Sequence, residues 1–181
     1  MHLVFKGFLA CLMLLFFTGC GSKVTYTIKP TPLEHGKSTY VINELNLHLI
    51  EQGKDITNLT YLTQEQLAES FKHNIASQLK EQGIYGNEYI VNIDIFYNRV
   101  FNIGGNKLNK PKFKYDIRIL NKNNELLASY TIPLSTTKYS YFKEIAVNTE
   151  ISTFNRDVED EPEDVELISK TIAKEIKEIG K

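Results

Sequence analysis

Apolar and polar residues alternate in five stretches of the chain, which is the pattern of β-strands with one buried face. These stretches are residues 24–28, 40–50, 89–97, 113–119 and 126–132. Pro30 and Pro133 are expected to end the first and the last strand, because proline cannot donate a backbone hydrogen bond. In the second stretch, the expected buried side chains share one parity: Val41, Leu45, Leu47 and Leu49. The asparagine-rich residues 121–124 predict a hairpin between the last two strands.

Two further stretches follow the helical period of 3.6 residues. Residues 64–82 carry an apolar stripe that repeats every four positions: Leu67, Phe71, Ile75 and Leu79. Thr63 and Gln66 have the spacing of a capping box at the start of this helix, and Gly83 fits the position after its end. Residues 161–179 form a second stripe with Pro162 in its first turn, where proline is tolerated.

The predicted order of elements is β-β-α-β-β-β-α. Its simplest packing is an α+β domain, in which two amphipathic helices cover one face of a mainly antiparallel sheet. Residues 134–160 are harder to interpret, and residues 145–154 fit either a short helix or a strand. The chain of 181 residues is long enough for one domain with a proper core.

The N-terminal segment has a different character. Lys6 precedes a run of ten apolar residues, 8–17, and Thr18-Gly19-Cys20 follows. Such a run is too short to cross a bilayer, which takes about 20 helical residues. It fits the apolar region of an export signal. The alternatives are an ordinary signal peptide that happens to end in cysteine, or an uncut signal anchor.

Residues 17–20 resemble the lipobox of bacterial lipoproteins, although Phe17 replaces the usual leucine. The resemblance implies a signal peptide at 1–19, a lipid on the Cys20 thiol, cleavage before Cys20 and acylation of the new amine. Residues 20–23 would then be a lipidated tether, and residues 24–181 a single periplasmic domain. Gly21 lacks the aspartate that retains enterobacterial-type lipoproteins in the inner membrane. We therefore expect the outer membrane as the location, with the domain facing the periplasm.

Composition narrows the range of partners. Removal of residues 1–19 leaves 20 basic and 22 acidic side chains, a net charge near −2. This charge argues against a nucleic acid as partner, because phosphate binding requires a basic surface. Cys20 would be the only cysteine of the mature chain, so no internal disulfide is expected.

Motifs for catalysis or cofactor binding do not stand out. His35, His48 and His73 are not spaced as metal ligands, and we interpret them as surface residues. There is no nucleophile elbow and no HExxH motif. We therefore expect no enzymatic activity, no cofactor and no metal site.

Two segments are candidate contact surfaces. Residues 157–166 carry seven acids, which indicate either a site for a cation or basic partner, or a solvated loop and first helical turn. The second segment holds Tyr139, Tyr141 and Phe142. Aromatic side chains in a loop can contact a partner or a membrane, but they can also fold back onto the core.

The order of elements resembles the small YajG-like outer-membrane lipoproteins. The resembling segments are residues 24–30, 67–83, 89–97 and 165–179, whereas residues 139–160 look longer than that family's pattern. The resemblance implies a fold and a location but no activity.

We therefore expect a lipid-anchored, non-enzymatic envelope lipoprotein. It would be an interaction or accessory module at the outer membrane, with the membrane and envelope proteins as partners. The alternative is an auxiliary lipoprotein of a lipid-trafficking ABC transporter. Residues 20–26 loosely resemble the N-terminal segment of such proteins.

Overall fold

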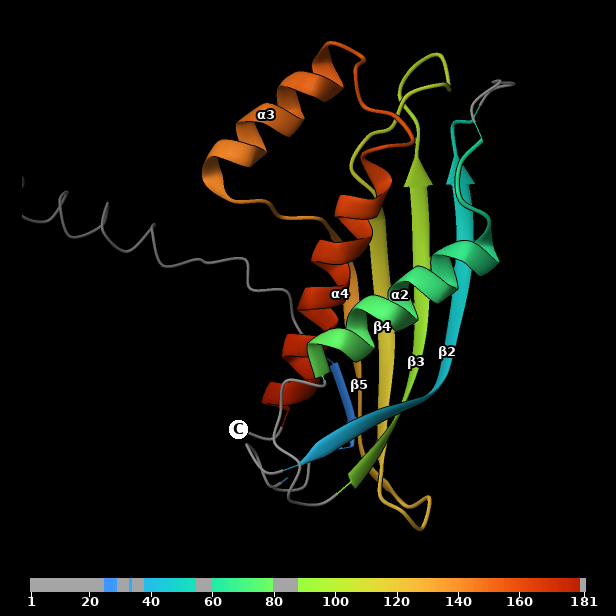
Figure 1. Ribbon diagram of the computed structural model, residues 1–181, viewed down its shortest axis with the longest axis vertical. Helices are drawn as coiled ribbons and strands as arrows, with labels where there is room; N and C mark the ends of the chain where they lie inside the picture. Colours follow the sequence, from blue (N-terminus) through green and yellow to red (C-terminus); the bar gives the residue numbers. More distant parts are fainter. Residues whose placement is uncertain (1–24, 29–32, 34–37, 55–59, 80–87, 180–181) are drawn as a thin grey trace, which may run out of the picture.

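The computed structural model describes residues 25–28, 33, 38–54, 60–79 and 88–179. Its elements, in chain order, are β1 Thr25–Ile28, β2 Thr39–Gln52, α2 Gln64–Leu79, β3 Glu88–Val100, β4 Lys112–Leu120, β5 Leu126–Thr136, α3 Tyr141–Ser152 and α4 Glu161–Glu178. The strands form one sheet in the order β1-β5-β4-β3-β2 (Figure 1). Strands β2 and β3 are parallel and are joined through α2, and the other described strand pairs are antiparallel.

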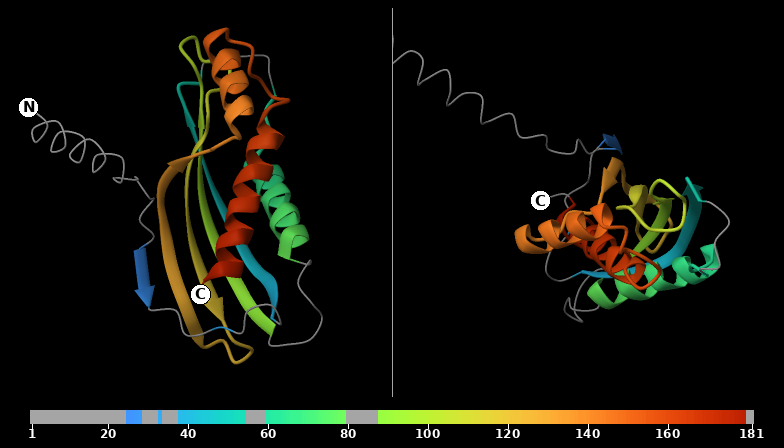
Figure 2. Two further views of the ribbon diagram at one scale, coloured as in Figure 1. Left: turned by 90° about the vertical axis from the view of Figure 1, so that its left-hand side faces the viewer. Right: turned by 90° about the horizontal axis from the view of Figure 1, so that it is seen from above.

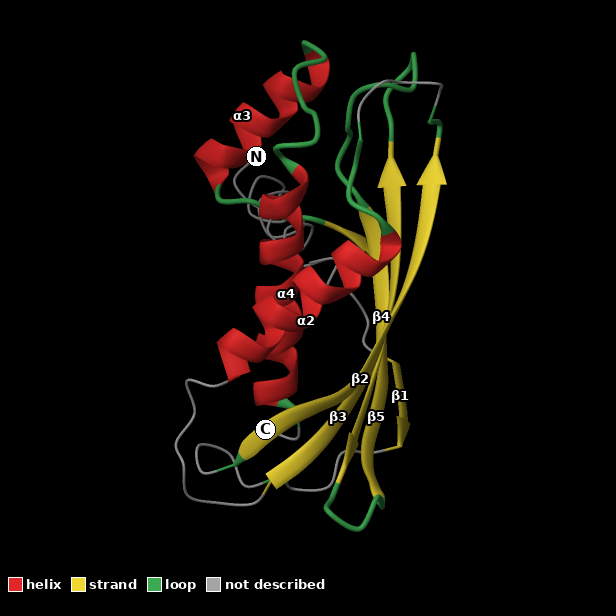
Figure 3. Ribbon diagram, turned by 45° about the vertical axis from the view of Figure 1, so that its right-hand side comes forward, coloured by secondary structure: helices red, strands yellow, loops and turns green. Residues whose placement is uncertain are grey.

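Helices α2 and α4 cover one face of the sheet and cross each other there (Figure 3). The predicted stripe of α2 is buried at all four positions. Alternate residues of β3 and β4 face these helices with no more than 7 % exposure, as their patterns predict. The α+β class and the two helices on one face are therefore confirmed.

The capping box of α2 is also present. The Thr63 N–H donates to Gln66 Oε1 at 2.9 Å, and the Gln66 N–H donates to Thr63 Oγ1 at 3.3 Å. These bonds satisfy two backbone donors that the first helical turn leaves unpaired. Gly83 and the end predicted for this helix at residue 82 lie outside the described residues.

The structure corrects the predicted burial in β2. Val41 is 44 % exposed and Tyr40 is buried, whereas Leu47 is buried as expected. The register against β3 shifts between Ile42 and Glu44. A bulge adds one residue to one strand, so the side chains before and after it exchange faces.

Pro133 does not end β5, which continues to Thr136. The described pairs between β1 and β5 reach only as far as Thr131, and the register against β4 shifts beyond Ile132. Proline is tolerated at an edge or a bulge because no ladder hydrogen bond needs its nitrogen there. The prediction of a strand end at Pro133 was therefore wrong.

Residues 134–160 contain α3, a helix that the predicted order of elements lacks. Of the two alternatives for residues 145–154, the structure contains the helix, and it starts earlier, at Tyr141. Helix α3 lies beyond the end of α4 and projects from the body of the domain (Figures 1 and 2). It is joined to β5 on one side and to α4 on the other.

Candidate functional site

Helix α3 has an unusual distribution of side chains around its axis. At 3.6 residues per turn, positions 141, 142, 145, 146, 148, 149 and 152 fall on one arc. All seven are exposed, and none of them is charged. Surface helices ordinarily place charged and polar residues on the solvent side, so this arrangement is the reverse of the usual one.

The apolar part of this arc comprises Tyr141, Phe142 and Ile145, which we call the α3 patch. Their exposed fractions are 76 %, 82 % and 51 %. The rings of Tyr141 and Phe142 contact each other edge to face, with centroids 5.4 Å apart. Residues three and four positions apart are neighbours on a helix, so Ile145 lies next to both rings.

The charged residues of α3 lie on the opposite arc, and two of them, Lys143 and Glu144, pair with the body of the domain. Lys143 Nζ contacts Glu163 Oε2 at 2.9 Å, and Glu144 is paired with Lys110. The lysine lowers the pKa of the Glu144 carboxyl. Val147 is the buried residue of the helix. Helix α3 is thus held mainly by polar contacts, and its apolar side faces solvent.

Both ends of the α3 segment meet at one carboxylate. Before the helix, the Tyr139 hydroxyl donates to Asp164 Oδ1. After it, Arg156 Nη2 donates to Asp164 Oδ2 at 2.6 Å and to the Tyr139 hydroxyl at 3.1 Å. Arg156 and Asp164 are each 1 % exposed. We call these three residues the Asp164 clip, and it fixes the two ends of α3 to the first turns of α4.

A second buried cluster lies nearby, at the start of α4. Arg99 binds Glu161 through two bonds, Nε to Oε1 at 2.6 Å and Nη2 to Oε2 at 2.9 Å. Arg99 also donates to Glu51 and to the Leu62 carbonyl, each at 2.8 Å. Its guanidinium lies over the Tyr61 ring, 5.2 Å from the centroid.

Burial shifts the pKa values of these carboxyls. It raises the pKa of Glu161 above its ordinary value, and Arg99 opposes the shift. Burial likewise raises the pKa of Asp164, with Arg156 opposing it. Removal from water penalises the charged form of a carboxyl, and an adjacent cation favours it. Because these groups pair with one another and are not exposed, they are structural in character.

Neither interpretation of the acidic run 157–166 fully describes it. Glu161 and Asp164 are buried in ion pairs, whereas a solvated loop and first turn would leave them exposed. Asp157 and Glu163 do lie near the surface, where they pair with Lys107 and Lys143. Among the described residues, no group of histidines, cysteines and acids is arranged to hold a metal ion.

The predicted contact residues differ in their exposure to solvent. Tyr141 and Phe142 are exposed, so they are available for contact. Tyr139 is partly buried, and its hydroxyl belongs to the Asp164 clip, so it supports α3 and is not part of the exposed surface. Cys20 lies outside the described residues, and its lipidation stays a prediction.

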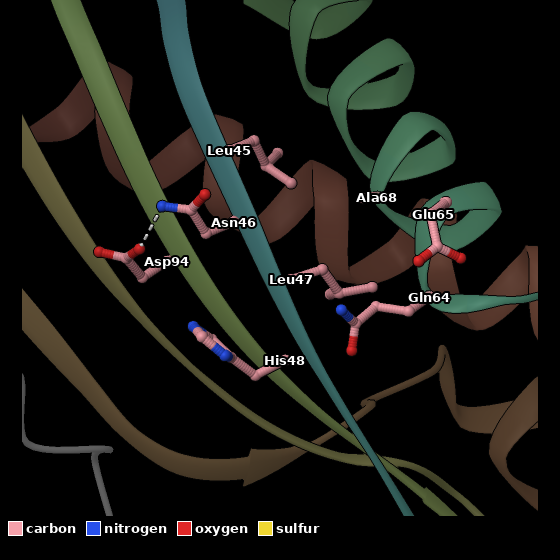
Figure 4. Close-up of a pocket in the computed structure, with 8 residues that line it drawn as sticks. All are labelled: Leu45, Asn46, Leu47, His48, Gln64, Glu65, Ala68 and Asp94. Atoms are coloured by element: carbon pink, nitrogen blue, oxygen red, sulfur yellow. Dashed lines mark hydrogen bonds between the residues drawn. The ribbon is translucent and has the colours of Figure 1, made fainter.

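A shallow hollow lies at the free edge of the sheet, along β2, with a volume of about 480 Å³. Figure 4 shows that Leu45 and Leu47 point toward α2, whereas Asn46, His48 and Asp94 lie on the other side of the sheet. Asn46 donates to Asp94 at 2.9 Å, and His48 stacks on Phe96. The hollow therefore curves around a strand edge, and two of its polar side chains, Asn46 and Asp94, bond to each other.

The described histidines lie at the surface, and the described helices are too short or too polar to cross a membrane. His48 and His73 are both exposed, as expected, while His35 lies outside the described residues. Within the part of the chain that the structure describes, no helix has the length and apolar character needed to span a bilayer.

No protein-family model and no curated protein matches this chain. Solved structures do match it. A DUF330 protein from Xanthomonas campestris has a TM-score of 0.50 at 8 % identity, over 86 % of this chain and 94 % of that one. The likeness shows a shared fold. The resemblance to YajG-like lipoproteins stays a prediction.

Two lower-scoring matches are a PelC dodecamer and a provisionally described lipoprotein. PelC from Paraburkholderia phytofirmans has a TM-score of 0.37 at 11 % identity, over 83 % of this chain and 96 % of its own. The provisional lipoprotein, from Caulobacter crescentus CB15, has a TM-score of 0.32 at 10 % identity, over 72 % and 84 %.

Proposed function

We propose that this protein is a lipid-anchored accessory protein of the bacterial envelope that acts by contact and not by catalysis. It would be held at the outer membrane through Cys20, with its domain in the periplasm. The observation that carries this proposal is the outward arc of α3. A surface helix that turns aromatic rings to solvent and pairs its charges with the rest of the domain is suited to meet another surface, because exposed apolar patches mark interaction sites.

The buried charges support the non-enzymatic part of the proposal. Carboxyls with raised pKa values often belong to active sites when they line a cleft. Glu161 and Asp164 do not, since they are 1 % exposed and are bonded to Arg99 and Arg156. Their role is to hold α4, β3 and the α3 segment together, which is the role of a scaffold.

Replacement of Cys20 tests the anchor. In Cys20→Ser the lipid acceptor is lost, so we expect the protein to leave the membrane fraction or to accumulate as an uncut precursor. The measurement is cell fractionation combined with the mass of the N-terminal peptide. A Cys20→Ser protein that stays in the membrane fraction at its mature size would contradict the anchor. Ser22→Ala, two residues further on, is the matched control and should change neither result.

Crosslinking in intact cells tests the accessory role. A photoreactive side chain at Ile50, which is 54 % exposed on the free edge strand β2, should form adducts with envelope proteins. These adducts should require Cys20, because the anchor places the domain at the membrane. Recovery of inner-membrane transporter subunits would instead favour the transporter-auxiliary function. Identical adducts with and without Cys20 would contradict a role that depends on the anchor.

A further inference from the structure

We infer that the α3 patch rests on the lipid bilayer itself and forms a second membrane contact beside the lipid on Cys20. This inference depends on the proposed lipid anchor and adds to it a fixed orientation of the domain. The occupant of the patch is the interface of a phospholipid bilayer. The patch is Tyr141, Phe142 and Ile145 on the outward arc of α3.

The chemistry of the outward arc suits that interface. Amphipathic helices lie in the headgroup region with their large apolar side chains inserted, and tyrosine is favoured at that depth. The arc carries no charge, and its remaining residues are Ala146, Asn148, Thr149 and Ser152. No ionised group would therefore have to lose its water when the arc touches lipid. Exposed Lys138, just before the helix, can approach anionic headgroups.

The direction of β1 allows the anchor to reach the end of the domain that carries α3. Strand β1 is antiparallel to β5, and Thr25 pairs with Thr131. Strand β1 therefore starts, at Thr25, on the side toward which β5 runs on its way to α3. Strand β1 is the neighbour of β5 at the sheet edge opposite β2, and α3 follows β5 along the chain.

The lengths of the two segments agree as well. Thr25 lies five residue steps after Cys20, and these steps span at most about 17 Å when extended. The five residue steps of β5 from Thr131 to Thr136 advance by about the same distance, roughly 17 Å. The lipid on Cys20 can therefore reach the level at which β5 ends and the α3 segment begins. The anchor is therefore long enough for the lipid and the patch to meet one membrane surface.

Tryptophan fluorescence offers a direct test because the chain contains no tryptophan. The probe is Phe142→Trp in the full-length protein, purified in its lipidated form and reconstituted into phosphatidylethanolamine–phosphatidylglycerol vesicles with brominated acyl chains. We expect its emission to shift to shorter wavelengths and to lose most of its intensity to bromine quenching. Leu126→Trp is the matched control, since Leu126 is 41 % exposed at the other end of β5. Its emission should be unchanged.

The possible results separate the two proposals. If the protein carries the lipid but Phe142→Trp is quenched no more than Leu126→Trp, the bilayer contact is wrong and the anchor stands. If mass spectrometry finds no lipid on Cys20, the anchor is wrong. The unlipidated protein then decides the contact, which is supported if Phe142→Trp is still quenched and overturned if it is not.

A second copy of the chain is the competing occupant of the patch. In that case the blue shift of Phe142→Trp would appear without vesicles and would grow with protein concentration, and bilayer docking would be overturned. The variant Tyr141→Ser/Phe142→Ser/Ile145→Ser supplies an independent readout. It should keep its circular dichroism spectrum, and a probe at Ala146→Trp in that background should lose the quenching seen when the patch is intact.

Discussion

At the scale of single residues, two arginines determine how the domain is tied together. The chain contains three arginines, and Arg99 and Arg156 are 2 % and 1 % exposed. Each binds a carboxylate of α4, Glu161 or Asp164, at 2.6 Å. Arginine suits such positions because its planar guanidinium makes several directed hydrogen bonds and always stays charged. Arg118, the third arginine, lies on the surface and pairs with Asp94 at 3.2 Å.

These differences predict unequal costs for the same substitution. Arg99→Met should lower the free energy of unfolding by about 3–5 kcal/mol, because it leaves the Glu161 carboxylate buried without its cation. Arg118→Met is the matched control and should change it by no more than about 1 kcal/mol, as is usual for exposed ion pairs. Urea unfolding followed by circular dichroism measures both. Equal costs for the two variants would show that the buried pair adds nothing beyond a surface pair.

The raised pKa of Glu161 predicts a specific dependence of stability on pH. A carboxyl whose pKa is higher in the folded state binds protons more readily there, so it favours folding in acid. Its contribution is fully present below about pH 4.5, the ordinary value, and is lost as the pH rises through the folded-state pKa. Glu161→Gln lacks this titration. The stability of the wild type relative to Glu161→Gln should therefore fall as the pH rises from 4.5.

Urea unfolding of both proteins between pH 4 and pH 8 measures this difference. Glu51 offers a contrast, because its bonds to Lys54 and Arg99 outweigh its partial burial and lower its pKa. The stability of the wild type relative to Glu51→Gln should rise with pH over the acid range. If the Glu161→Gln comparison also rose with pH, Arg99 would outweigh burial at that site.

At the scale of elements, the sequence predicts a helix or strand best where the pattern of its buried side chains continues unbroken along the whole element. The stripe of α2 and the alternation in β3 and β4 determine those elements and their buried faces. The hairpin at residues 121–124 is also as expected, with Asn124 at a φ of 61°. Asparagine tolerates this left-handed conformation better than other non-glycine residues, so its presence marks the turn.

Prediction failed where tertiary contacts override the local pattern. In β2, the bulge near Asn43 exchanges which side chains face the core before and after it. In β5, Pro133 is accommodated because the described pairs with β1 do not extend as far as this residue. Helix α3 has its apolar residues on the solvent side, so it lacks the periodic buried stripe from which helices are recognised. Neither a bulge nor an unpaired edge leaves a signature in one sequence.

The buried ion pairs do have a signature in the sequence. Arg99 has the parity of Ile95 and Tyr97, which places it on the buried face of β3. Glu161 and Asp164 continue the stripe of Val165 and Ile168 at helical spacing. A charged residue at a position that belongs to a buried face predicts a buried ion pair when a second element carries a residue of opposite charge on its own buried face. The exposed arc of α3 could not be found this way, since a sequence does not state which face is covered.

At the scale of the whole molecule, stability is unevenly distributed. The sheet, α2 and α4 share one continuous apolar core, whereas α3 contributes only Val147 to the buried set. Helix α3 depends on the Asp164 clip and on the surface pairs of Lys143 and Glu144. Segments with few buried apolar contacts open with less free energy than the global unfolding requires. Helix α3 should therefore behave as a separate, weaker unit attached to a rigid body.

Hydrogen exchange followed by mass spectrometry tests this division. In the wild type, peptides from α3 should exchange by local opening while peptides from β3, β4 and α4 stay protected. The variant Asp164→Ala should accelerate exchange in α3 far more than in β4, because it frees both ends of the α3 segment at once. Glu166→Ala is the control on the same helix, since Glu166 pairs only with Lys170 at the surface. It should leave α3 unchanged. If α3 exchanged only together with β4 in the wild type, the clip would join it to the core as one cooperative unit, and the α3 patch would be presented as rigidly as the sheet itself.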